Sequence, residues 1–151
     1  MQKLLHLVEK LALQIPNADK VNKDVSNANI AWHIEHSCLV IIKITETLKK
    51  SDPKKFQAKF NFKKIFVFLI GKFPRGRAKA PEVVMPIENI TTTHLEESIL
   101  KTKAAIIELQ NCEKNNHFSH PIFGSLNAPE TIKFLRIHTH HHLLIIQDIL
   151  K

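Results

Sequence analysis

The sequence predicts an all-α protein: a four-helix bundle with one long basic excursion between its second and third long helices. Four long segments repeat apolar residues every three or four positions, which is the period of one helix face. Only three glycines occur among the 151 residues, so little of the chain suits tight β-hairpins. The length suits a single domain over residues 1–151.

The first two helices are expected before residue 51. The first covers residues 3–15, and Pro16 ends it. The second begins after a cap at Ser26 or Asn27 and runs to about Lys50. Its two apolar stripes are Ile30, His33, Ser37, Val40 and Ile44 on one side and Ile34, Cys38, Ile41 and Leu48 on the other. Two stripes predict a helix that is buried on most sides.

The excursion is expected to hold shorter elements. A short basic helix starts at residues 51–53, and an apolar helix over residues 65–70 follows Asn61 and ends at Gly71. Residues 72–86 then read as an ordered but irregular loop. A connection of this length permits a crossed topology as well as a simple up-and-down order.

The last two helices have recognisable starts. Thr93 is the expected cap of a helix over residues 94–114, with Glu96 at capping-box distance. Asn127 is the expected cap of the final helix, with Glu130 three residues on. The seam of that final helix contains Leu135, His138, His142, Ile145 and Ile149. Each amphipathic stripe must be buried against another helix, which favours a bundle.

The net charge of +8 is concentrated in one part of the chain. Residues 49–79 contain eleven Lys or Arg and one acid. No nucleic-acid-binding motif accompanies this charge, so nucleic acid is not an expected partner. Arg75, Arg77 and Lys79 stand beside Phe73 and could receive a phosphate or an acidic partner, or form a solvated loop.

Other classes of protein are disfavoured. No apolar run approaches the ~18 residues of a membrane-spanning helix, and the first residues lack a signal-peptide core. We therefore expect a cytoplasmic protein with no membrane partner. Cys38 and Cys112 have no CxxC spacing, so neither a thiolate zinc cluster nor a disulfide framework is indicated.

The histidines carry the functional signal. Four of the ten histidines lie in the segment that starts at His138 and ends at His142. On a helix His138 and His142 share one face a turn apart, His141 lies about 60° aside, and His140 points nearly opposite. A single core histidine is more often a hydrogen-bonded packing residue than a ligand. Two in one apolar seam favour a shared metal ion, and His33 is the best third candidate from its stripe.

Three segments carry a resemblance to a known family. They are His33-Ile34-Glu35-His36-Ser37, His120-Pro121-Ile122-Phe123-Gly124-Ser125-Leu126 and Ile137-His138-Thr139-His140-His141-His142. Together they resemble the DinB and YfiT-like superfamily of metal-dependent four-helix-bundle proteins. The turn is similar to that of a branch known as a domain of unknown function. The resemblance covers roughly residues 20–150 and implies a DinB-type bundle.

The resemblance also implies a ligand set. One histidine of the second helix and the HxxxH pair hold a divalent metal ion, which by motif position are His33, His138 and His142. Three neutral imidazoles suit zinc or nickel first, then iron, cobalt or manganese, and leave an open coordination position. His36 and His141 flank these ligands and are the expected catalytic or proton-transfer groups.

Two functions follow from these features. The first is a metal-dependent hydrolase or thiol-dependent transferase acting on a small molecule that the sequence does not identify, which is what the resemblance implies. The alternative is a non-catalytic binding module that uses residues 49–79 for an anionic partner. A homodimer is compatible with either function. Glu35 is expected to face solvent, and His6, His94 and His117 are expected at the surface.

Overall fold

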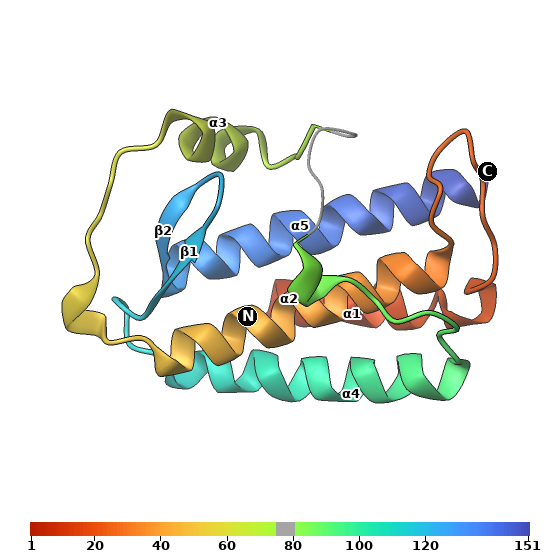
Figure 1. Cartoon of the computed structure of the whole chain (residues 1–151), viewed down its shortest axis with the longest axis horizontal. Coiled ribbons are helices and arrows are strands. Elements are labelled where there is room, and N and C mark those ends of the chain that lie inside the picture. Colours follow the sequence, from red (N-terminus) through yellow and green to blue (C-terminus); the bar gives the residue numbers. More distant parts are fainter. Residues whose placement is uncertain (75–80) are drawn as a thin grey trace.

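The computed structural model describes residues 1–74 and 81–151 (Figure 1), and helices dominate it. The helices are α1 (Gln2–Ala12), α2 (Ile30–Lys50), α3 (Phe62–Ile70), α4 (Thr92–Glu108) and α5 (Ala128–Ile149). Short 3-10 turns lie at η1 (Ile15–Asn17), η2 (Pro53–Lys55), η3 (Glu82–Val84) and η4 (Leu109–Asn111). Strands β1 (His117–His120) and β2 (Gly124–Asn127) form a hairpin before α5.

Four helices pack around a shared core. Helices α1 and α2 each contact both α4 and α5. Figure 1 shows α2 and α4 running in the same direction, while α1 and α5 run the opposite way. The connection between α2 and α4 must therefore return along the length of the molecule, which is the crossed order that the sequence allowed.

Apolar side chains from all four of these helices fill the core. Among the fully buried ones are Leu4, Leu11, Ile34, Ile41, Leu95, Ile106, Leu135 and Ile146. The two stripes of α2 are both buried over most of their length, as their spacing predicted. Hydroxyl groups inside α2 bond back to their own helix, as Ser37 Oγ does to the carbonyl oxygen of His33 at 2.8 Å.

Several helix ends differ from the sequence predictions. The cap of α2 is Asn29, whose side chain accepts a hydrogen bond from the Trp32 backbone N–H. The cap of α4 is Thr91, and the expected Thr93 lies inside the helix. Helix α4 also ends at Glu108, before the predicted end at residue 114, and the predicted basic helix after residue 51 is only the turn η2.

The cap of α5 and the residue that ends α3 agree with prediction. The side chain of Asn127 accepts from the Glu130 N–H, and Glu130 accepts from the Asn127 N–H, which completes a capping box. Asn61 caps α3, and Gly71 ends it with a φ of 69°. The predicted loop that follows is described only in part: Arg75, Arg77 and Lys79 lie outside the described residues.

The sequence did not predict the hairpin. It pairs His117 with Asn127 and His120 with Gly124 in antiparallel register. The intervening turn was expected; Phe123 within it is 4% exposed and packs inward, and Gly124 at its end has a positive φ of 71°. Strands of four residues are too short to show a repeating pattern, and this pair adds a small sheet to a mainly helical fold.

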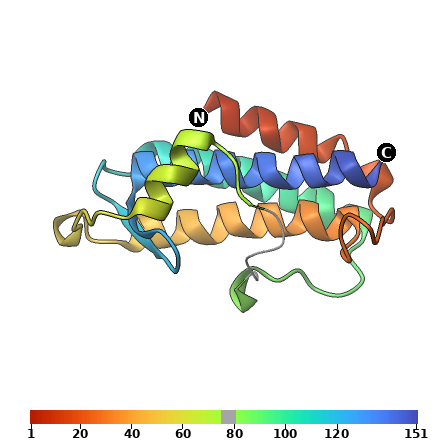
Figure 2. The same ribbon diagram turned by 90° about the horizontal axis from the view of Figure 1, so that it is seen from above.

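The excursion is attached to the start of α5. Figures 1 and 2 show α3 lying on the outside of the molecule beside the hairpin. Lys64 Nζ lies 2.8 Å from Glu130 Oε1, and the Asn61 side-chain amide donates to the carbonyl oxygen of Ile122 at 3.0 Å. Within the described ranges, no helix is both long and apolar enough to cross a membrane.

Candidate metal centre

Three imidazoles meet between α2 and α5. One ring nitrogen from each of His36, His138 and His142 lies within 4.8 Å of the others. The ring centroids are 4.6 Å apart for His138 and His142, 4.9 Å for His36 and His142, and 5.1 Å for His36 and His138. The pair on α5 faces α2 because its i,i+4 spacing places both rings on one face. Trp32 packs on the His36 ring at 4.8 Å, nearly parallel to it.

The tautomer of His36 follows from its hydrogen bond. Its Nδ1 lies 2.8 Å from the carbonyl oxygen of Val84. A carbonyl can only accept, so the proton of neutral His36 is on Nδ1 and the lone pair is on Nε2. This is the arrangement found around histidine ligands, in which the second ring nitrogen is held by an acceptor. Val84 belongs to η3, so the excursion orients His36.

His33 lies at the edge of the cluster. Its Nδ1 is 3.0 Å from His142 Nδ1, and its Nε2 is 3.0 Å from Ser26 Oγ. One of the two Nδ1 atoms must donate and the other accept. If His142 donates, then His33 donates to Ser26 and the lone pair of His142 Nε2 is left free. If His33 donates, then His142 Nε2 carries the proton instead.

His138 supplies the clearest sign that the cluster fits an ion. Its Nδ1 is buried and has no hydrogen-bond partner within the described part of the chain. A buried polar atom without a partner costs about 1–3 kcal/mol, and such atoms are rare in folded proteins. A metal ion held by three imidazoles is the kind of group that this donor set accommodates.

Burial keeps the cluster uncharged. Burial is the main reason why the pKa of His33 is lowered to about 4, and the nearby His36 and His141 lower it further. Burial also lowers the pKa of His36, partly offset by the hydrogen bond to Val84. The pKa values of His138 and His142 lie well below 6.5, again chiefly through burial. Neutral imidazoles are the form that binds metal, so the cluster is ready to ligate at neutral pH.

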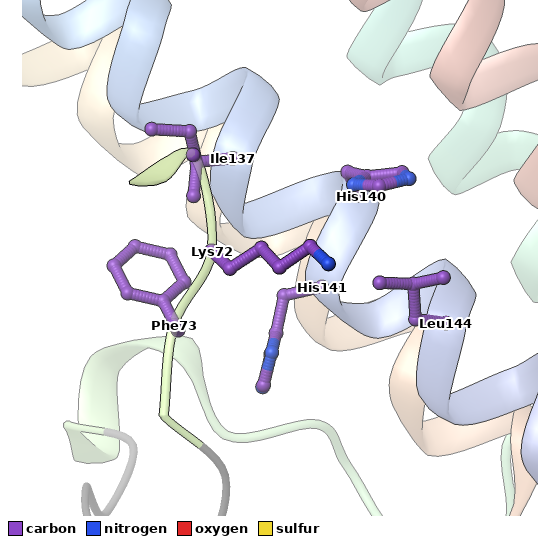
Figure 3. A pocket seen from close by; sticks show the side chains of 7 residues that line it. Lys72, Phe73, Ile137, His140, His141 and Leu144 are labelled. Carbon is purple, nitrogen blue, oxygen red and sulfur yellow. The ribbon is translucent and has the colours of Figure 1, made fainter. Parts of the chain in front are cut away.

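A cavity adjoins the cluster on the outer side of α5. It measures about 200 Å³, and Figure 3 shows His141 and Phe73 on its wall. Its lining is Gly71, Lys72, Phe73, Ile137, His140, His141 and Leu144. The His141 ring is 5.3 Å from that of His142 and 5.8 Å from that of Phe73. His141 therefore stands between the cavity and the cluster.

A second hollow shares part of this wall. It measures about 400 Å³, and Gly71, Ile137 and His140 line both spaces. The rest of its lining is Lys3, His6, Leu7, Lys133 and Arg136. Neither lining contains an acidic residue among the residues that the structure describes. Among the described residues, the charged side chains are Lys72 in the first lining and Lys3, Lys133 and Arg136 in the second.

The structure places the predicted residues as follows. His138 and His142 come together, and the third ring nitrogen within 4.8 Å belongs to His36, which the sequence assigned to catalysis. His33, the third ligand suggested by its stripe and by the resemblance, contacts His142 from the side. His140 is exposed, in keeping with its expected direction away from the seam.

Two of the other histidines lie close to polar groups of the chain. Glu35 does not face solvent as predicted: it is 3% exposed, and its Oε1 lies 3.1 Å from His94 Nε2. The helical wheel of α2 could not show this, because α4 covers the side that carries Glu35. His120 shapes the turn before β2, because its Nδ1 accepts from the backbone N–H groups of Ile122 and Phe123.

Comparisons with protein-family models, with curated proteins and with solved structures each return no match.

Proposed function

We propose that the protein binds one divalent transition-metal ion through His36, His138 and His142. The observation that carries this proposal is the approach of their ring nitrogens to within 4.8 Å of one another in a buried site. Two further features support it: Val84 orients His36, and His138 Nδ1 has no partner in the described structure. Nitrogen ligands of this kind suit zinc or nickel best.

His33 is proposed as a positioning residue for His142. In the tautomer compatible with binding through Nε2, His142 donates from Nδ1 to His33, and His33 donates to Ser26. This chain of hydrogen bonds would fix the ring of His142 and favour its free lone pair. The proposal differs from the ligand set implied by the DinB resemblance, in which His33 itself binds the ion.

The same site supports a proposed hydrolase or thiol-dependent transferase activity on a small anionic molecule. A bound divalent ion would supply Lewis acidity, and three protein ligands would leave room for a substrate group. Lys72 and His140 on the cavity wall would hold a negatively charged substrate, and Phe73 would exclude water. His141 lies at the boundary and is the residue placed to hold or move a proton.

Calorimetric titration of zinc and nickel into the metal-free full chain tests the ligand set. We expect one ion per chain and loss of most of the affinity in His36→Ala, His138→Ala and His142→Ala. His140→Ala, on the exposed side of the same helix, is the matched control and should bind as wild type. Equal losses in His140→Ala and His138→Ala would overturn the proposed site.

The single tryptophan gives an independent readout. Trp32 packs on His36, so nickel bound by His36 should quench its fluorescence in a saturable way. Quenching that persists in His36→Ala while His33→Ala abolishes it would support the alternative ligand set with His33.

A further inference from the structure

Helix α3 and Phe60, two residues before it, expose an unusual number of apolar side chains. Phe60 is 84% exposed, Phe62 71% and Leu69 80%. We define the α3 apolar face as Phe60, Phe62, Ile65, Phe66, Leu69 and Ile70, all of which are exposed. Val67 and Lys64 point inward instead. Isolated exposed apolar residues are common, but a contiguous set of this kind marks an interaction surface.

The surroundings of this face are cationic. Lys54, Lys55, Lys59, Lys63 and Lys72 are exposed, and no acidic residue occurs between positions 53 and 74. Lys64 differs from these five lysines, because it is buried and forms an ion pair with Glu130. The other five have no ion-pair partner within the described ranges.

We propose that the α3 apolar face docks on the surface of an anionic lipid bilayer. The aromatic and aliphatic side chains would enter the region between headgroups and acyl chains, and the lysines would remain at the level of the phosphates. A nine-residue helix is about 14 Å long and would lie in the plane of the membrane. The sequence predicted no membrane partner because no segment can span one; surface docking needs no span.

Charge argues against a second copy of the chain as the occupant. Self-association through this face would bring two lysine-rich segments together, and like charges repel. The composition also argues against nucleic acid. Bases could stack on the three phenylalanines of the face, but its other half, Ile65, Leu69 and Ile70, offers no such surface and is suited to hydrocarbon.

The position of α3 agrees with docking on a broad surface. Figures 1 and 2 show it at the periphery, beside the hairpin and on the outer side of α5. Its inner side is held by Lys64 and by Phe68, whose ring lies under Lys133 at 5.3 Å. The helix can therefore present its outer side without leaving the protein. The proposal is independent of the metal site.

Sedimentation of the full chain with lipid vesicles tests the proposal. We expect binding to vesicles of phosphatidylcholine with phosphatidylglycerol, much weaker binding to pure phosphatidylcholine, and release as salt is raised. Phe62→Ser combined with Leu69→Ser should lower the partition coefficient at least about tenfold, because two large apolar groups no longer enter the bilayer. Leu100→Ser combined with Ile107→Ser, at exposed sites on α4, is the control and should bind as wild type.

A second variant separates charge from burial. Lys54→Gln, Lys59→Gln and Lys63→Gln together should reduce binding to anionic vesicles without changing the thermal unfolding curve. Three outcomes would overturn the proposal: no binding to anionic vesicles, unchanged binding of the Phe62 and Leu69 variant, or a concentration-dependent dimer that this variant abolishes. Tighter binding to single-stranded DNA than to vesicles would assign the surface to nucleic acid instead.

Discussion

His33 and His142 face each other through identical atoms, with their Nδ1 nitrogens 3.0 Å apart. Because only one of the two can carry the shared proton, the tautomer of His142 depends on what His33 does with its other nitrogen. Ser26 Oγ lies 3.0 Å from that nitrogen. A hydroxyl group in the loop before α2 therefore helps to decide which nitrogen of His142 has a free lone pair.

This contact predicts that loss of His33 weakens metal binding without abolishing it. Its replacement by Ala should weaken zinc binding about 10–100-fold, the usual effect of losing a residue that orients a metal ligand. The stoichiometry should stay at one ion per chain. Isothermal titration calorimetry measures both quantities. A loss as complete as that in His142→Ala would show that His33 is itself a ligand.

The stability of the metal-free protein should fall on acidification, and His120 should contribute. Burial lowers its pKa to about 4 in the folded state, against 6.5 for an unperturbed histidine. Between these values the unfolded chain binds a proton that the folded chain does not. The contribution of His120 is therefore fully present above pH 6.5 and is lost towards pH 4, by at most about 1.4 kcal/mol per pH unit.

Urea unfolding at pH 7 and pH 5 with a chelator present measures this slope. His120→Gln should be less stable at pH 7, because two backbone N–H groups lose their acceptor, but it should depend less on pH. Exposed His140→Gln serves as the control. An unchanged slope in His120→Gln would contradict the assignment.

The pair formed by Glu35 and His94 should respond unequally to substitution. His94→Ala leaves a buried carboxyl group without its partner and should destabilise the fold by about 2 kcal/mol. Glu35→Met removes the polar group and fills a similar volume, so its cost should be smaller. Denaturant midpoints at one pH provide the comparison. If Glu35→Met were clearly the more damaging change, the carboxyl group would have to stabilise the α2–α4 contact by more than this pairing.

Gly124 should be costly to replace for reasons of backbone conformation alone. Its φ is 71°, and a Cβ built there would meet nothing within 4 Å. Gly124→Ala should therefore destabilise the protein by about 1 kcal/mol, the cost of the left-handed region for a residue with a Cβ. Gly124→Asn should cost less, because asparagine tolerates this region. Thermal unfolding of the two variants gives the comparison, and equal stabilities of wild type and Gly124→Ala would refute the prediction.

Local patterns made α5 predictable. Its cap and its histidine spacing lie within short stretches of sequence, and helix geometry alone brings His138 and His142 onto one face. The choice between His33 and His36 could not be made in this way. Both are buried on α2, and the difference depends on Val84, which lies 48 residues beyond His36 in the chain.

One other feature could not be predicted for a similar reason. The exposed face of α3 could not be foreseen because its apolar residues resemble those of any core helix. Only the tertiary structure shows that Val67 and Lys64 are its buried residues.

The DinB type of bundle stays a prediction, since the packing of four helices is compatible with it but does not single it out.

One carboxylate joins two parts of the molecule. Glu130 Oε1 pairs with Lys64 Nζ, while Oε2 accepts the Asn127 backbone N–H at the start of α5. When α3 opens away from the protein, Glu130 loses its cation, and the first turn of α5 loses part of what holds its capping residue in place. We therefore expect backbone amides of α3 and of the first turn of α5 to exchange with solvent as one cooperative unit, faster than those around His142.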